Sequence, residues 1–255
     1  MRYFADLVIN ENVKLYKRPR GLVLLTLLIL MNFAVAIVMK FIFTDTNFTF
    51  WDHLNVSTFL IFVLNFVCII IAGDIVSSEY SQGTIKLLLI RPANRLKILV
   101  AKYVAVILFV LLVIFVHLLT TIMFGSILFY SSILELDVEF LGKITANYFF
   151  GFIELIIIAS FAMMLSVVTR SSVFSVSVPI FLLMSVTLLL EVMSHYNIHH
   201  GKYLVFANTN LSQHVVGRPL FEGMTMNFSL LNIGVHMIFF FALSALLFSK
   251  RDVKV

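Results

Sequence analysis

Six long apolar runs constrain the fold of this chain more than any other feature of its sequence. Each holds roughly 20 predominantly apolar residues, the length that an α-helix needs to cross about 30 Å of hydrocarbon. The chain has 255 residues, of which 61% are hydrophobic and 12% charged, a balance far too apolar for a soluble domain. We therefore predict an all-α membrane protein with a single transmembrane domain over residues 1–255. The predicted spans are Leu22–Phe43, Leu54–Ala72, Leu99–Phe124, Thr145–Val168, Val173–Leu190 and Phe228–Phe248.

Two further expectations concern the regions next to these spans. The third apolar run continues without a charge beyond the length of one crossing, and we expect its tail from Gly125 to Leu134 to lie along the membrane surface. Residues 1–20 mix apolar and polar positions and end in basic residues, a pattern that predicts an interfacial helix, with a frayed basic tail as the alternative. Membrane lipids are therefore expected partners, since basic residues are attracted to anionic headgroups.

The distribution of Lys and Arg predicts the orientation of the chain. An even number of spans places both termini on one side of the membrane, and the segments on that side hold 14 of the 18 Lys and Arg residues. Because cytoplasmic segments are enriched in basic residues, we expect both termini in the cytoplasm, with the protein in the bacterial cell membrane. The net charge of +5 is then a topology signal. No nucleic-acid partner is expected, since that would require a basic soluble face.

A polar stretch from Asp74 to Lys102 separates the second and third spans. Apolar runs flank it on both sides, so we expect it to lie in water against the cytoplasmic face. We interpret residues 74–98 as an ordered insert on which a soluble partner docks.

The residues of this insert predict a short helix between two corners. Gly83 can adopt backbone angles closed to other residues, and Thr84 can then cap a helix that continues to Ile90. Pro92 ends that helix, because the residue before a proline is pushed out of the helical region. The next membrane helix is expected to begin at Arg95.

Three residues within the spans are candidates for a translocation path. Glu154 carries a carboxylate that costs on the order of 2.5–3.5 kcal/mol near a helix centre, so it should face the bundle interior or a wet cavity. It serves there either as a hydrogen-bonded strut or as a lining group of the path. Asn65 gains most by facing another helix. Pro179 lies inside the fifth span and should kink it, because proline removes a backbone hydrogen bond.

The external segment over residues 191–227 contains several histidines and short apolar pieces. The apolar pieces predict short re-entrant helices that dip into the outer leaflet. His195, His199 and His200 have a spacing that suits one helical face, but no H-E-x-x-H motif and no well-placed acidic ligand accompany them, so no metal site is expected. The chain also lacks a phosphate-binding loop and a nucleophile elbow, so we expect neither catalytic residues nor a cofactor of its own.

The architecture and the insert resemble the permease subunit of an ABC-2 type ATP-binding-cassette exporter. In that family a Glu stands four residues before Gly-Thr, and two leucines, a Pro, an Arg and a Lys follow. The matching residues are Glu79, Gly83, Thr84, Leu87, Leu88, Pro92, Arg95 and Lys102. Lys86 departs from the pattern, because that position is often acidic in the family, and this departure can alter which ATPase surface is accepted.

The resemblance implies a set of partners and a division of labour. Two permeases, identical or homologous, would pair to enclose a path, and two separate ATPase subunits would bind ATP and Mg beneath them. The insert would transmit their closure, with Glu79 holding it either to the N-terminal helix or to a basic group on the ATPase. Arg95 and Lys102 would tie that movement to the third span.

The apolar, charge-poor spans suit an amphipathic or apolar cargo better than a small ion. The small size resembles permeases that export amphipathic peptides of the phenol-soluble modulin kind. Relatives of that family also expel antibiotics, lantibiotic-type peptides or lipid-linked glycans. Outside transport, a scaffold or immunity protein that binds a partner without pumping, and a membrane enzyme that uses the external histidines, remain alternatives.

Overall fold

The computed structural model describes residues 2–17, 19–43, 47–84, 94–133 and 138–250. Its described residues contain helices and no strand. Six helical stretches in them are long and apolar enough to cross a membrane, and they correspond to the six predicted spans. The prediction of an all-α membrane protein is therefore confirmed. The six stretches are Pro19–Ile42, Phe50–Ser81, Arg95–Leu128, Phe140–Thr169, Ser172–His195 and Met226–Lys250.

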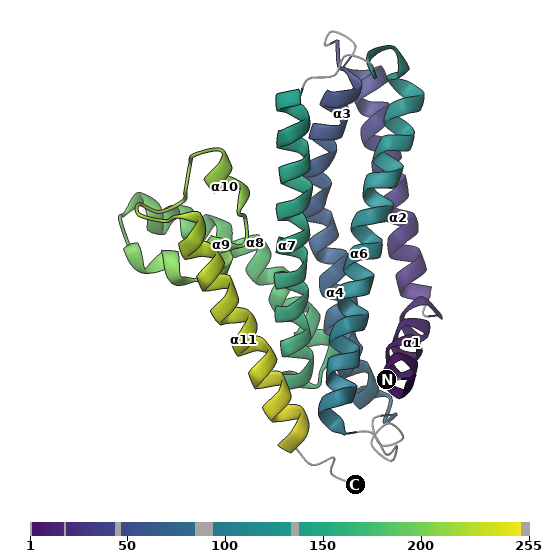
Figure 1. Cartoon of the computed structure of the whole chain (residues 1–255), viewed down its shortest axis with the longest axis vertical. Helices are drawn as coiled ribbons and strands as arrows, with labels where there is room; N and C mark the ends of the chain where they lie inside the picture. Colours follow the sequence, from purple (N-terminus) through teal and green to yellow (C-terminus); the bar gives the residue numbers. More distant parts are fainter. Residues whose placement is uncertain (1, 18, 44–46, 85–93, 134–137, 251–255) are drawn as a thin grey trace.

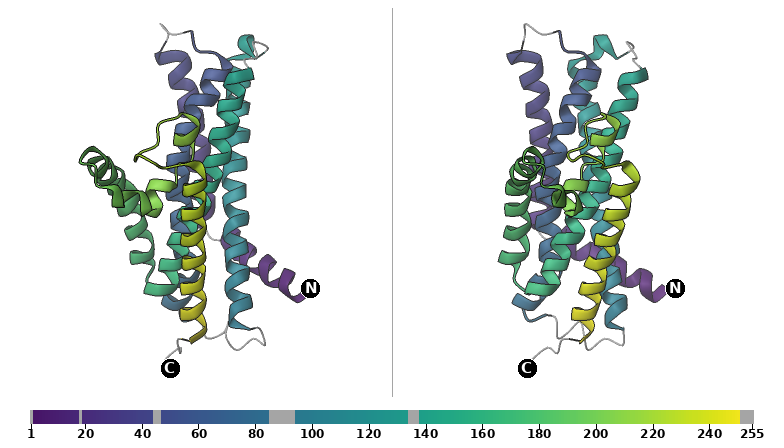
Figure 2. Two further views of the ribbon diagram at one scale, coloured as in Figure 1. Left: turned by 60° about the vertical axis from the view of Figure 1, so that its left-hand side comes forward. Right: turned by 90° about the vertical axis from the view of Figure 1, so that its left-hand side faces the viewer.

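The long helices α2, α4, α6 and α7 stand side by side and form the main bundle, with α1 set obliquely against its lower end (Figures 1 and 2). The start of α1 and the end of α11 lie toward the same end of the bundle. The helices are α1 (Arg2–Lys17), α2 (Pro19–Ile37), α3 (Phe50–Ser57), α4 (Ile61–Ser81), α6 (Arg95–Leu128), α7 (Val138–Thr169), α8 (Ser172–His195), α9 (Val205–Asn208), α10 (Ser212–Val215) and α11 (Met226–Lys250).

The α3–α4 span is the most enclosed of the six. In its most apolar window 72% of residues are buried, against 17% in α11. Apolar side chains such as Leu64 on α4, Phe109 on α6 and Leu155 on α7 form the shared core. Polar groups on α4 consequently face protein, where they can find partners that lipid does not offer.

Small residues let α8 approach α4 closely. Ser175 of α8 donates a hydrogen bond of 2.7 Å to the carbonyl oxygen of Gly73 on α4. A Cβ atom at Gly73 would lie 2.8 Å from the backbone oxygen of Ser175. This contact follows the general use of small residues where membrane helices cross.

The chain between α8 and α11 folds into short helices, as predicted for residues 191–227. A 3₁₀ turn over His199–Tyr203 precedes α9 and α10. These elements lie beside the middle of α7, well below its upper end (Figures 1 and 2). The short helices are therefore present as expected, and their predicted position in the outer leaflet remains a prediction.

Two expectations about segment boundaries are wrong. In the tail predicted from Gly125 to Leu134, the described residues do not separate from the bundle: α6 continues to Leu128, and a 3₁₀ turn at Tyr130–Ser132 follows. Leu134 lies outside the described residues. Gly125 packs against Phe50 and His53. Ser132 accepts a hydrogen bond of 2.8 Å from the backbone N–H of Phe50. Contact with α3 therefore holds this tail in the protein.

The polar stretch between the second and third spans does not lie entirely in water either. Its first part continues α4 to Ser81, and its last part opens α6 at Arg95. Asp74, Glu79 and Lys102 are buried, with exposed fractions of 5%, 4% and 0%. The charges can be buried because each has an opposite charge within reach on a neighbouring helix.

Candidate functional site

An ionic cluster joins α1, α4 and α6 at the end of the bundle where the predicted insert begins and ends. Two carboxylates and two ammonium groups alternate in it. The Nζ atom of Lys14 lies 2.6 Å from Glu11 and 3.0 Å from Glu79, and Nζ of Lys102 lies 2.6 Å from Glu11 and 2.8 Å from Glu79.

Lys102 is fully enclosed in this cluster. Its side chain is 0% exposed, and those of both glutamates are 5% exposed. The ammonium group donates hydrogen bonds of 2.6 Å to Oε2 of Glu11 and 3.3 Å to the carbonyl oxygen of Ile75, and Glu79 is its second ion-pair partner. These hydrogen bonds and the two carboxylates together offset the large cost of removing a charge from water.

The cluster shifts the pKa values of both groups on α1. Burial by itself would raise the pKa of Glu11, but the charges and hydrogen bonds of Lys102 and Lys14 outweigh it and lower that pKa. Burial would lower the pKa of Lys14, yet Glu79 and Glu11 outweigh it and raise that pKa. Both groups are therefore held in their charged forms.

The face of α1 that meets the bundle is set by helical spacing. Leu7, Glu11 and Lys14 recur at intervals of four and three residues and so share one face. Ile9 and Val13 are exposed on the rest of the helix. Glu11 and Lys14 were missed as candidate residues, although a Glu three residues before a Lys on an amphipathic helix is a signal that the sequence contains.

Some of the predicted coupling residues can be placed, and others cannot. Gly83 has φ +69°, the left-handed conformation expected of it. The Thr84 hydroxyl donates to the carbonyl oxygen of Glu79 at 3.4 Å, and Arg95 opens α6 and donates to the carbonyl oxygen of Ser249 on α11 at 3.1 Å. Leu87, Leu88 and Pro92, with the predicted short helix up to Ile90, lie outside the described residues.

A second polar centre lies within the spans, between α4 and α7. Asn65 donates a side-chain hydrogen bond of 2.7 Å to Oε1 of Glu154. Asn65 is 0% exposed, and the oxygen of its side-chain amide, Oδ1, has no hydrogen-bond partner among the described residues. The sequence left the partner of Glu154 open, and the structure shows that this partner is Asn65. Asn65 is itself one of the predicted path residues.

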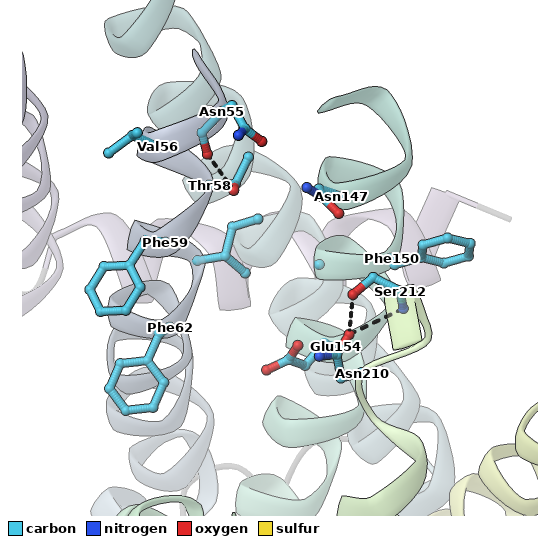
Figure 3. Close-up of a pocket in the computed structure, with 12 residues that line it drawn as sticks. Asn55, Val56, Thr58, Phe59, Phe62, Asn147, Phe150, Glu154, Asn210 and Ser212 are labelled. Atoms are coloured by element: carbon cyan, nitrogen blue, oxygen red, sulfur yellow. Dashed lines mark hydrogen bonds between the residues drawn. The ribbon is translucent and has the colours of Figure 1, made fainter. Parts of the chain in front are cut away.

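Glu154 also borders two neighbouring cavities. One, of about 520 Å³, combines side-chain amides and hydroxyls with Phe59 and Phe62. Figure 3 shows Glu154, Asn210 and Ser212 gathered at one side of it. The other cavity, of about 360 Å³, shares Glu154 and Asn210 with the first. The polar side chains of the first cavity are Asn55, Thr58, Asn147, Glu154, Asn210 and Ser212.

Pro179 and the histidines of residues 191–227 stand apart from this centre. Pro179 is buried inside α8 and is not among the described residues that line either cavity. Among the described residues no three His, Cys, Asp or Glu side chains gather as a metal site would require. His214 instead shares a hydrogen bond of 2.8 Å with the hydroxyl of Ser229.

Comparison with known proteins finds a matching family model and relatives, one of which is described as a membrane protein. A family model described as "Protein of unknown function (DUF2705)" matches residues 21–254. The chain is 34% identical over 223 residues to "Uncharacterized protein YhcI" of Bacillus subtilis (strain 168), covering 82% of this chain and 71% of that protein. It is 32% identical over 248 residues to "Uncharacterized membrane protein YdbK" of the same organism, covering 95% of this chain and 100% of that protein.

Proposed function

The chain belongs to the DUF2705 family, and we propose that it is the permease subunit of an ATP-binding-cassette exporter. Two permeases pair to enclose a path, and separate ATPase subunits bind and hydrolyse ATP with Mg. Both termini and the insert lie in the cytoplasm, and α1 lies at the membrane interface. The exposed apolar residues Ile9, Val13 and Tyr16 on α1 support that interfacial position.

The ionic cluster is the observation that carries this proposal. The predicted insert over residues 74–98, where the ATPase would dock, includes the end of α4 and the start of α6, and Glu79 and Lys102 join those two helices by an ion pair of 2.8 Å. Both residues also bind groups on α1. A push on the insert would therefore act on two spans and the interfacial helix together. Buried charge pairs suit this task, because breaking one is costly and the three helices consequently move as a unit.

The cavities beside Glu154 support an amphipathic cargo. Together they place amides, hydroxyls, the carboxylates of Glu154 and Glu191 and the guanidinium of Arg218 next to phenylalanine side chains. A peptide with one polar and one apolar face matches this mixture. We propose amphipathic peptides of the phenol-soluble modulin kind as the cargo.

Co-purification tests this function. The protein would be extracted gently from its native membrane, the co-eluting proteins identified, and ATP hydrolysis measured with and without amphipathic peptide. We expect a stoichiometric ATPase subunit that is lost on Arg95→Glu and retained on Lys40→Glu, a matched charge reversal at the far end of the first span. Peptide should stimulate hydrolysis.

Other outcomes assign the protein differently. If an ATPase co-purifies but amphipathic peptide does not stimulate its ATP hydrolysis, the exporter function stands. The cargo is then an antibiotic, a lantibiotic-type peptide or a lipid-linked glycan. The absence of any ATPase from the folded protein would overturn the exporter and favour a membrane scaffold or immunity protein.

A further inference from the structure

Two adjoining cavities beside the start of α8 differ sharply in character. The first, of about 490 Å³, is polar and basic, and Arg20, Gln82 and Arg170 line it together with serines. The second, of about 820 Å³, is mainly apolar and follows α8. Arg20, Ser172 and Val173 line both cavities, so the two are neighbours along one surface.

The basic cavity offers several donors to an anion. Arg170 lines the cavity and stacks over the ring of Tyr80, with its guanidinium carbon 4.5 Å from the ring centroid. Its Nε atom is buried and has no hydrogen-bond partner among the described residues. Arg20 is paired with Asp74 through one nitrogen, while 69% of its side chain remains exposed. An arginine has five N–H donors, so this pairing leaves several for a ligand.

The beginning of α8 adds backbone donors at the same place. Its N-cap residue, Ser171, makes no side-chain capping hydrogen bond, and the first bond within the helix runs from the Ser175 N–H to Ser171. The N–H groups of the first turn therefore have no acceptor within the helix, and the positive end of a 24-residue helix borders the cavity. Arg170 reaches this position through a turn in which its own φ is +55°.

The apolar groove is suited to a hydrocarbon chain. Ile180, Phe181 and Met184 line it, and the last two are 69% and 59% exposed. Asp74 is the one carboxylate among its described lining residues, and Arg20 already neutralises it. With Arg20, Arg170 and Asp74 counted, the two cavities keep a net charge of about +1.

The membrane depth of the two cavities matches their chemistry. Arg20 is the second residue of the first span and Ser172 is the first residue of the fifth, so the basic cavity lies at a boundary of the spans. Figure 1 shows α7 ending and α8 beginning at the end of the bundle near α1. From there the apolar groove extends along α8 to Met184, within the layer that the spans occupy.

We propose that these cavities together bind one anionic phospholipid. Its phosphate lies between Arg20, Arg170 and the first turn of α8, and an acyl chain occupies the groove along α8. The site does not depend on whether the protein is an exporter. The occupant is a lipid and not free phosphate, because the anion-binding cavity opens directly into a groove that only hydrocarbon fills well.

Lipid titration of the whole purified protein tests this site. The protein in neutral detergent would receive phosphatidylglycerol or phosphatidylcholine, with native mass spectrometry to count bound lipid and thermal unfolding to follow stabilisation. We expect one phosphatidylglycerol to bind preferentially and to raise the unfolding midpoint. Arg170→Gln should weaken its apparent affinity about fivefold.

Two further variants keep the test independent of misfolding. Ser177→Trp fills the groove from an exposed position without changing charge, and it should also weaken phosphatidylglycerol binding. Lys97→Gln removes the charge of an exposed residue that lines neither cavity. This variant should bind phosphatidylglycerol as tightly as wild type does. Equal binding of the two lipids, or wild-type binding by both Arg170→Gln and Ser177→Trp, would overturn the proposal. So would full stabilisation by inorganic phosphate alone.

Discussion

Lys102 on α6 and Glu11 on α1 stand 91 residues apart in the sequence and form an ion pair with 2.6 Å between Nζ and Oε2. The pair fixes the N-terminal helix to the third span at a place where both side chains are shielded from water. Because Glu79 shares the same ammonium group, the end of the second span is included in the same contact.

Replacing Lys102 tests how strongly this contact holds the helices. Lys102→Met keeps the length of the side chain but leaves Glu11 and Glu79 buried with one cation fewer. We expect a loss of about 3–5 kcal/mol of stability, since uncompensated buried charge is costly. Thermal unfolding in detergent measures it. Lys97→Met, at an exposed site five residues earlier on α6, is the control and should unfold like wild type. Equal unfolding midpoints for Lys102→Met and wild type would contradict the prediction.

The stability of the cluster should also depend on pH. The pKa of Glu11 is lowered in the folded protein, so its ionised form stabilises the fold. This contribution to stability is complete at pH values above 4.5, the ordinary pKa of a Glu side chain. It is lost as the pH falls through the lower pKa that Glu11 has in the folded protein. The difference in unfolding midpoint between wild type and Glu11→Gln should therefore narrow only below pH 4.5.

Asp6→Asn is the control for this titration, because it removes an exposed carboxylate from the same helix. It should reproduce the wild-type pH profile. A difference between wild type and Glu11→Gln that stays constant down to strongly acidic pH would show that the charge of Glu11 does not stabilise the cluster.

Gly73→Ala should disturb the contact between α4 and α8. The added Cβ would lie 2.8 Å from a backbone oxygen of Ser175, and a backbone oxygen cannot move away as the tip of a side chain can. We expect a clear fall in the unfolding midpoint. Gly234→Ala, in a helix with open space around the new Cβ, should be neutral or slightly stabilising. Equal effects of the two variants would show that α8 can shift without cost.

Variants of Glu154 separate its structural role from a role in transport. Glu154→Gln keeps an oxygen that can accept the hydrogen bond from Asn65, so the protein should remain folded. Glu154→Leu leaves a buried amide unpartnered and should cost about 1–3 kcal/mol. If the carboxylate lines the path, Glu154→Gln should lose peptide-stimulated ATP hydrolysis while keeping its unfolding midpoint. Wild-type hydrolysis by Glu154→Gln would leave Glu154 with the strut role alone.

The sequence alone was sufficient for the fold class and for most local features. Hydropathy and length located all six spans, because crossing hydrocarbon demands about 20 apolar residues regardless of what they contact. The N-terminal helix, the positive φ of Gly83, the start of α6 at Arg95 and the short helices before α11 follow from equally local rules. Glu154 could be recognised as a residue in need of a partner, because a carboxylate at that depth is expensive.

Only the tertiary structure decided which groups meet. Asn65 reaches Glu154 across 89 residues, and Glu11 and Lys14 enter a cluster with Glu79 and Lys102. Composition placed the charges of residues 74–102 in water, but packing buried Asp74, Glu79 and Lys102 against opposite charges. Hydropathy depends on each residue and its neighbours along the chain. The burial of a charge depends on what a different helix brings within hydrogen-bonding distance, and only the packed bundle determines that.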